Sequence, residues 1–295
     1  MESPLETAPI APFGVEVQAD LSRPLSDAAQ AALRALVVAH KLLVFRGQRL
    51  SEAAQVRAMG YLGRVLGPQG EYREVSADGN LGAGPLAFHS DLAFTPAPFK
   101  LLSLHAVAVN DEESWTRFAD HVGVLDRLEP ALAAAIAGRD ARTVISLVQS
   151  HRAVAFDNPA FLPQQLRPAI IAHPATGEPV LYISEMQTAR IEGMPRPESD
   201  ALLARLFAAL QAPDNVYEHR WRNGDLVIWD NIAMTHARCD LAGMHPRRLQ
   251  RVAVADKSFF DLCPQFDLGD PRVSAWASGE TLAIEATAAR GETTP

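Results

Sequence analysis

The sequence is poor in cysteine, and its cysteines form neither a framework nor a ligand set. Cys239 and Cys263 are the only two in a chain of 295 residues. Small secreted folds that disulfides hold together need a dense, even set of cysteines, so this class is excluded. The scarcity of cysteine leads us to expect a reducing, cytoplasmic environment.

Long apolar runs and an excess of basic charge are also missing. No run approaches the ~20 apolar residues that span a bilayer. The first twelve residues have neither the basic nor the apolar segment of a signal peptide. Asp and Glu (35) outnumber Lys and Arg (27), which gives a formal net charge of −8. Because an acidic chain is repelled by nucleic acid and by anionic membranes, we expect neither as a partner.

No internal repeat divides the chain, and no linker is long enough to separate two domains. We expect one domain over residues 13–275, because all-β folds often use such a length as a single unit. Residues 1–12 and the Ala-, Thr- and Glu-rich residues 279–295 are expected to be flexible termini.

Local patterns predict helices around a core of short strands. Ser26 and Ser51 stand where N-caps would begin two early helices. Residues 122–138 predict another helix, and the Gly- and Pro-rich residues 68–86 predict a long loop. Apolar runs that are typical of buried strands occur at 42–45, 101–109 and 226–229. The favoured fold class is mainly β with peripheral helices.

The triplet His89-Ser90-Asp91 and the distant His236 carry the strongest chemical signal. Two imidazoles and one carboxylate form the ligand set of non-haem Fe(II) oxygenases, which leaves open positions on the metal. Residues two apart in an extended segment point to one side, so His89 and Asp91 are placed to share one ion. His236 has to join them from another strand. Taken alone, the triplet also fits a turn in which Asp91 accepts backbone hydrogen bonds and His89 is a core residue.

The stretch that leads to His236 resembles a known family. It runs from Tyr217-Glu218-His219-Arg220-Trp221 into Trp229-Asp230-Asn231, and an earlier segment reads Leu42-Leu43-Val44-Phe45-Arg46-Gly47-Gln48. Further polar residues recur at set distances from the two histidines: Thr116 after His89, and Arg247 and Arg251 after His236. With these motifs, residues 13–256 resemble the Fe(II)/2-oxoglutarate-dependent dioxygenases of the taurine dioxygenase and 2,4-dichlorophenoxyacetate dioxygenase type.

The resemblance implies a double-stranded β-helix, or jelly-roll, core and a defined site. It implies Fe(II), O₂ and the cosubstrate 2-oxoglutarate, with hydroxylation of a small, anionic organic substrate and release of succinate and CO₂. It leaves room for a homo-oligomer. The implied iron ligands are His89, Asp91 and His236; Thr116 and Arg247 would bind the distal carboxylate of 2-oxoglutarate, and Arg251 would face the cosubstrate or an anionic substrate.

The residue types suit this chemistry without the resemblance. Three protein ligands leave room on an octahedral ion for a chelating 2-oxo acid and for O₂. The distal carboxylate of that acid needs a planar, bidentate partner, which favours arginine over lysine. A threonine hydroxyl adds one neutral donor.

Two of the departures from the family concern residues near the predicted binding site. Glu113-Ser114-Trp115-Thr116 replaces the usual Gly-Gly-Asp-Thr, and we expect Trp115 to add bulk beside the cosubstrate. Pro85 stands where taurine-type enzymes carry a substrate-binding asparagine, so we do not expect taurine as the substrate.

Two alternatives remain open at this point. The same site is also suited to desaturation or ring closure in a natural-product pathway, because the outcome depends on where the substrate lies. The chain also fits a non-catalytic jelly-roll binding module that never loads iron.

Overall fold

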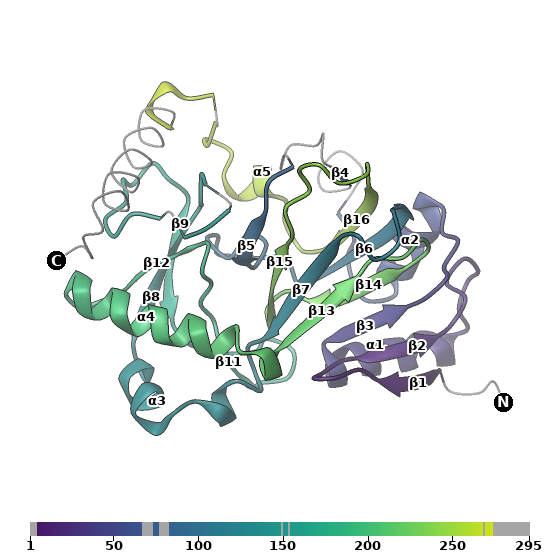
Figure 1. The fold of residues 1–295 in the computed structure, drawn as a ribbon, viewed down its shortest axis with the longest axis horizontal. Helices are drawn as coiled ribbons and strands as arrows, with labels where there is room; N and C mark the ends of the chain where they lie inside the picture. The colour runs from purple at the N-terminus through teal and green to yellow at the C-terminus, as the bar shows by residue number, and fades with distance from the viewer. Residues whose placement is uncertain are drawn as a thin grey trace.

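Two sheets form the centre of the structure, and helices lie outside them (Figure 1). The computed structural model describes residues 5–66, 73–76, 83–148, 150–152, 154–267 and 269–273. The larger sheet has the order β1 (Glu6–Pro9), β2 (Val15–Gln18), β3 (Leu42–Phe45), β14 (Leu226–Asp230), β6 (Leu101–Ala108), β16 (Arg248–Val254), β4 (Arg73–Ser76). The smaller sheet has the order β13 (Val216–Arg220), β7 (Trp115–Asp120), β15 (Met234–Arg238), β5 (Leu86–His89).

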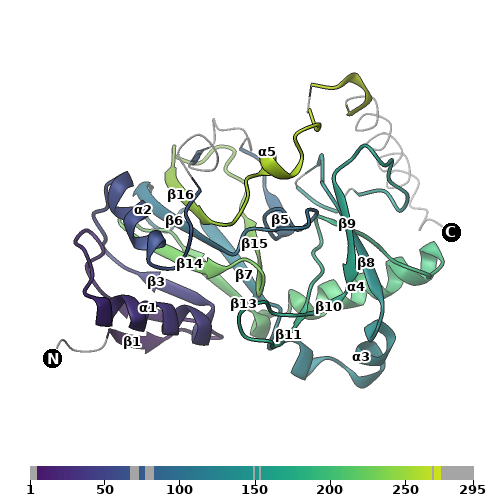
Figure 2. The ribbon, with the colours of Figure 1, turned by 180° about the vertical axis from the view of Figure 1, so that it is seen from behind.

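A three-stranded sheet and a two-stranded sheet stand beside this centre, and the helices cover outer faces. The views from both sides place α1 and α2 against the larger sheet and α4 along the three-stranded sheet (Figure 2). The additional strands are β12 (Thr188–Ile191), β8 (Asp140–Val144), β9 (Gln164–Pro168), β10 (Ile170–Ala172) and β11 (Pro179–Leu181). The helices are α1 (Asp27–His40), α2 (Glu52–Gly60), α3 (Pro130–Ile136), α4 (Arg196–Leu210) and α5 (Phe259–Leu262), with 3-10 turns η1 (Leu125–Arg127) and η2 (Pro213–Asn215). The expected mainly β class with peripheral helices is confirmed.

Strand β14 is shared by two hydrophobic cores. It pairs with β3 on one side and with β6 on the other, and all its residues are buried. Because side chains alternate along a strand, Leu226 and Ile228 pack toward α1 and α2, whereas Val227 and Trp229 pack between the two central sheets. The apolar run predicted from the sequence is therefore a strand that is buried on both faces.

The helix starts were predicted well, and one helix was predicted too long. The Ser26 and Ser51 side chains accept hydrogen bonds from Ala29 N and Ala54 N, as N-caps do. The single helix expected over 122–138 is instead the turn η1 followed by α3. Pro130 begins α3, and a proline fits the first turn of a helix but not its interior.

Two segments that were expected to lack structure contain strands. β4 lies within the loop expected over 68–86 and pairs with β16, while 67–72 and 77–82 lie outside the described residues. β1 lies within the arm expected over 1–12 and pairs with β2, so part of that arm belongs to the larger sheet. Residues 279–295 lie outside the described residues. Across the described chain, no helix is both long and apolar enough to span a membrane.

Candidate metal centre

Strand pairing brings the two predicted histidines together. β15 and β5 are antiparallel neighbours, and His236 is the direct cross-strand partner of His89. Their ring centroids are 4.2 Å apart, as expected for side chains on one face of a sheet. Asp91 follows β5 in a turn, with its Oδ1 atom 3.4 Å from His89 Nε2 and 3.6 Å from His236 Nε2. Within the described part of the chain, these three residues are the one group with metal-ligand spacing, and their ligand atoms lie within 4.8 Å of one another.

A hydrogen bond orients the ring of His89, and burial keeps the ring of His236 neutral. His89 Nδ1 donates to the carbonyl oxygen of Ala87 at 2.8 Å, so its Nε2 carries the lone pair toward Asp91. The ring of His236 lies against Trp229 and Phe118, with centroid distances of 4.9 Å and 6.5 Å. Burial, followed by the neighbouring His89, lowers the pKa of His236 to about 3. Its imidazole is therefore neutral near pH 7, as metal binding requires.

Asp91 is held as a carboxylate by its neighbours. Burial works to raise its pKa, but the Arg251 guanidinium and the two histidines hold the pKa well below its usual range. Arg251 reaches Asp91 from β16, and its Nη2 donates to Asp91 Oδ2. The cation of Arg251 also lies over the ring of Phe99, 5.2 Å from its centroid. The structure thus places Arg251 beside the candidate metal ligands.

Asn231 fixes the backbone of the turn that carries Asp91. Its Oδ1 accepts from Asp91 N at 2.8 Å, and its Nδ2 donates to Asp91 O at 3.0 Å and to Phe99 O at 2.9 Å. The Ser90 hydroxyl donates to Asn231 O at 2.8 Å. Asn231 is fully buried. The turn that carries Asp91 is therefore bonded to the connection between β14 and β15.

Thr116 and Arg247, the residues predicted to bind 2-oxoglutarate, have other polar partners than the three candidate metal ligands. Thr116 is on β7, next to β15, and its Oγ1 accepts from Trp221 Nε1 at 3.0 Å. Arg247 precedes β16, and its Nη1 donates to Ser114 Oγ at 3.2 Å. Both Thr116 and Arg247 are buried. Among the described residues, Thr116 and Arg247 do not bond each other directly, but Ser114, which contacts Arg247, is separated from Thr116 by only one residue.

Arg247 is a buried cation without an acidic partner among the described residues. Its Nε also lacks a hydrogen-bond partner there. Burial lowers its pKa to about 10, Cys239 opposes that shift, and Arg238 adds to it, so the guanidinium stays charged near pH 7. A buried, unpaired charge is costly. The residues present therefore fit an acidic ligand such as the distal carboxylate of a 2-oxo diacid.

Trp115, which was expected to add bulk beside the cosubstrate, does not point to the same side of β7 as Thr116. Alternation along β7 points its ring to the opposite face, where Arg117 lies over it at 4.3 Å from the ring centroid. Ser114, another replacement in that segment, contacts Arg247.

Sequence reasoning missed how three residues support the site. Asn231 stood in the recognised motif without a role, and the structure shows that it holds the backbone of Asp91. Trp221 stood in the recognised motif without a role, and Ser114 was noted only as a lost glycine. An asparagine at the end of the apolar run 226–229 was a usable signal for Asn231, whereas the contacts of Trp221 and Ser114 depend on strand register.

Comparisons with known proteins agree on one family. A family model described as "Taurine catabolism dioxygenase TauD, TfdA family" matches residues 6–253. The (S)-phenoxypropionate/alpha-ketoglutarate-dioxygenase of Delftia acidovorans is 31% identical over 267 residues, covering 80% of this chain and 90% of that protein. The alpha-ketoglutarate-dependent sulfate ester dioxygenase of Pseudomonas putida is 28% identical over 268 residues, covering 82% and 84%. The crystal structure of AAD-2 in complex with Mn(II) and N-oxalylglycine matches with a TM-score of 0.73 and 25% identity, covering 86% and 98%.

Proposed function

Because the chain belongs to the taurine catabolism dioxygenase family of the TauD and TfdA type, we propose that it hydroxylates an unactivated C–H bond of a small anionic substrate. Its enzyme class is that of the 2-oxoglutarate-dependent non-haem iron dioxygenases, which use Fe(II), 2-oxoglutarate and O₂. Family membership sets aside a non-catalytic binding module. The balanced reaction consumes the substrate, 2-oxoglutarate and O₂ and yields the alcohol, succinate and CO₂.

His89, Asp91 and His236 are the proposed iron ligands. When bound, Fe(II) supplies coordination positions for the 2-oxo acid and O₂ and the oxidising power for the C–H bond. The neutral imidazole of His236 and the ionised carboxylate of Asp91 suit this metal near pH 7. The hydrogen bond from His89 Nδ1 to Ala87 O supports the ring orientation that a ligand needs.

Arg247 and Thr116 are proposed to hold the distal carboxylate of 2-oxoglutarate. The observation that carries this proposal is the buried guanidinium of Arg247, which no acidic side chain of the described residues neutralises. The N-oxalylglycine named with AAD-2 has the skeleton of 2-oxoglutarate with NH in place of one CH₂, which supports a diacid at this position.

Arg251 is proposed to bind the anionic group of the substrate. It lies at Asp91, next to the metal ligands, rather than at Ser114 and Arg247. The relatives named for (S)-phenoxypropionate and for sulfate esters both have anionic substrates, which supports this class. Pro85, which cannot act as the asparagine of taurine-type enzymes, argues against taurine.

We infer that the two central sheets form a double-stranded β-helix core. The support is their shared hydrophobic core, which draws residues from β14 and β6 of one sheet and from β7 and β15 of the other. This assignment and the single domain over 13–275 would place the metal centre between the two sheets.

Anaerobic loading followed by a pulse of O₂ tests the proposed function. Protein with Fe(II) and 2-oxoglutarate should release succinate in proportion to turnover of (S)-2-phenoxypropionate or a short alkyl sulfate, and not of taurine. The product mass separates hydroxylation, a gain of one oxygen, from desaturation or ring closure, a loss of two hydrogens. His236→Ala should abolish turnover, while His40→Ala, a control on α1, should keep it. Full turnover by His236→Ala would rule out the ligand assignment.

A further inference from the structure

Trp221 connects the two parts of the chain that are proposed to bind 2-oxoglutarate. It follows β13 and is fully buried. Its indole Nε1 donates to Thr116 Oγ1 at 3.0 Å, and its backbone N donates to the carbonyl oxygen of Ser114 at 3.0 Å. Ser114 in turn accepts from Arg247 through its hydroxyl. One residue thus fixes Thr116 and the support of Arg247 relative to each other.

The indole bond determines what the Thr116 hydroxyl is able to donate. An indole N–H is a donor only, whereas a hydroxyl has one proton and two lone pairs. Because Trp221 occupies a lone pair of Thr116, the hydroxyl proton remains for an acceptor, and no described residue accepts it. A carboxylate is an acceptor only, so it matches this proton.

We propose that Trp221 is a positioning residue for the cosubstrate, which aims the Thr116 hydroxyl proton at the distal carboxylate. This inference rests on the proposed function, since it presumes that 2-oxoglutarate binds at Thr116 and Arg247. Trp221 itself touches neither the metal ligands nor the reacting atoms; it acts through Thr116.

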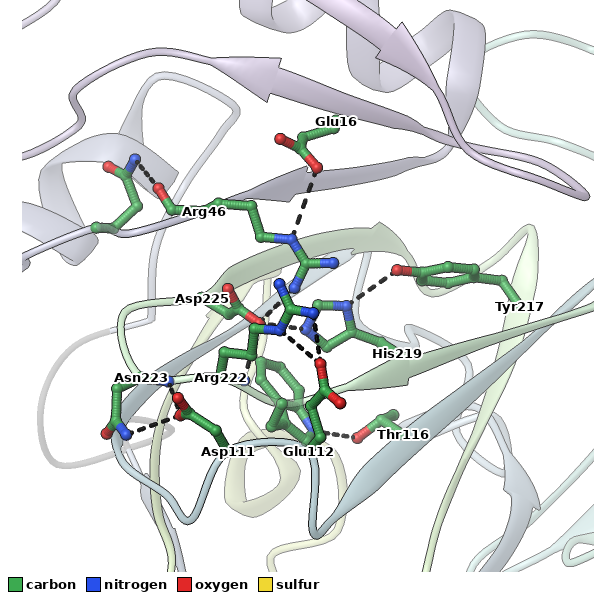
Figure 3. A network of polar contacts seen from close by, with 12 residues as sticks. Glu16, Arg46, Asp111, Glu112, Thr116, Tyr217, His219, Arg222, Asn223 and Asp225 are labelled. Atoms are coloured by element: carbon green, nitrogen blue, oxygen red, sulfur yellow. Dashed lines mark hydrogen bonds and ion pairs between the residues drawn. The ribbon is translucent and has the colours of Figure 1, made fainter.

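His219, which contacts the indole, belongs to a polar network with Tyr217 and Asp225, and Figure 3 shows this network. The ring of His219 meets Trp221 edge-on, with centroids 4.5 Å apart. His219 is also the cross-strand partner of Thr116. Its Nε2 donates to Asp225 Oδ2 at 3.1 Å, and its Nδ1 accepts from Tyr217 Oη at 3.1 Å.

The network extends from His219 to the surface. Asp225 Oδ2 also accepts from Arg46 Nη1 at 2.6 Å, and Arg46 Nε lies 3.6 Å from Glu16 Oε2 (Figure 3). Burial lowers the pKa of His219 although Asp225 opposes it, which keeps the ring neutral near pH 7. Because both ring nitrogens of His219 and the carboxylate of Asp225 are hydrogen-bonded, the His219 ring that packs against the indole has one preferred orientation.

Cosubstrate affinity in a double-mutant cycle tests the proposal. The dissociation constant of 2-oxoglutarate is read anaerobically from the absorption band of its Fe(II) complex, for Trp221→Phe, Thr116→Val and the double variant. The same titration uses 2-oxovalerate, which has five carbons but no distal carboxylate. Trp115→Phe is the matched control, since it removes an indole one residue from Thr116 but on the opposite face of β7.

We expect Trp221→Phe to raise the dissociation constant of 2-oxoglutarate about 10-fold when Thr116 is present. The change should be less than about twofold in the Thr116→Val background and for 2-oxovalerate. Trp115→Phe should leave both constants unchanged. Equal losses in both backgrounds, or for both acids, would mean that Trp221 acts by packing alone, and the proposal would be overturned.

A measurement on the unmodified chain covers the case in which Trp221→Phe does not fold. With Zn(II) in the site and ¹⁵N-labelled indoles, the Trp221 Nε1 resonance, assigned by Trp→Phe changes at the other tryptophans, should shift with 2-oxoglutarate and not with 2-oxovalerate. An unmoved resonance overturns the proposal. If the wild-type protein binds neither acid, the proposed function itself has failed, and the positioning role fails with it. If the wild-type protein binds 2-oxoglutarate normally but Trp221→Phe has the same effect with and without Thr116, only the positioning role is overturned.

Discussion

The two carboxylate oxygens of Asp91 serve different partners, and Arg251 holds one of them. Oδ2 receives Nη2 of Arg251, whereas Oδ1 faces His89 Nε2 at 3.4 Å and His236 Nε2 at 3.6 Å. The oxygen that faces the two imidazoles is the one free to bind a metal. The guanidinium is therefore next to the candidate metal ligands, where the anionic group of a substrate is proposed to bind.

Replacing Arg251 should weaken substrate binding but not cosubstrate binding. For Arg251→Met we expect the KM of an accepted anionic substrate to rise about 10- to 100-fold, because one charge-assisted hydrogen bond is lost. The dissociation constant of 2-oxoglutarate should change by less than about threefold. Arg248→Met, an exposed position on the same strand, is the control. If 2-oxoglutarate affinity falls by the larger factor instead, Arg251 belongs to the cosubstrate site.

Replacing Arg247 should weaken the binding of the cosubstrate 2-oxoglutarate. Arg247→Gln removes the buried cation at Ser114, so we expect 2-oxoglutarate to bind about 10- to 100-fold more weakly. Binding of 2-oxovalerate should not change. The affinity of Arg247→Lys for 2-oxoglutarate should fall between those of the wild type and Arg247→Gln, since an ammonium keeps the charge but not the planar fork. Anaerobic titration of the Fe(II) complex measures all three, and an equal loss for both acids would contradict this role.

Asn231 should support metal affinity through the backbone of Asp91. Asn231→Asp has the same shape but loses the donors to Asp91 O and Phe99 O, so Mn(II) affinity should fall about 10- to 100-fold by calorimetry. Asp230→Asn is the matched control one residue away. It disturbs a buried pair with His173 and should lower stability without changing Mn(II) affinity by more than about threefold. Equal losses of affinity would assign the effect to general loosening of the turn.

The buried His121 should make the metal-free protein less stable in acid. Its Nδ1 bonds Leu181 O and its Nε2 bonds Thr235 Oγ1, and burial lowers its pKa to about 4. The unfolded ring takes up a proton near pH 6.5, so the unfolded state binds more protons between these values and stability falls as the pH falls. The share of His121 is about 3 kcal/mol once the pH is below about 4.

Urea unfolding between pH 8 and pH 4.5 measures this effect. His121→Gln should show a shallower loss of unfolding free energy than the wild type below about pH 6.5. The value at pH 8, where the ring is neutral in both states, gives the cost of the substitution alone. Parallel curves would show that His121 does not titrate in this window.

The sequence allowed the residue types of the site to be predicted, because they depend on spacing and chemistry. His89 and Asp91 are close in sequence, and His236 follows a strand whose apolar run is evident. The structure brings all three together. Helix starts at Ser26 and Ser51 were also readable, since an N-cap is a local feature.

Contacts that depend on register between distant strands could not be read in this way. Arg251 meets Asp91 because β16 passes beside the turn after β5, and no local pattern encodes that pairing. β4 has no apolar alternation of its own and becomes a strand because it pairs with β16. The prediction that the Trp115 ring lies beside the cosubstrate was wrong. It relied on the closeness of Trp115 to Thr116 in sequence and ignored the alternation of side chains along β7.

Strand β14 has a consequence for any shortened form of the protein. Its backbone groups are matched on one side by β3, which lies in the first fifty residues, and on the other by β6. Deleting residues 1–60 would remove α1 and α2, which cover Ile228, and would leave β14 with one unpaired hydrogen-bonding edge. The same strand carries Trp229, whose ring packs against His236. A minimal version of this enzyme therefore has to retain its first 60 residues, about a fifth of the chain, although none of the proposed ligands comes from them.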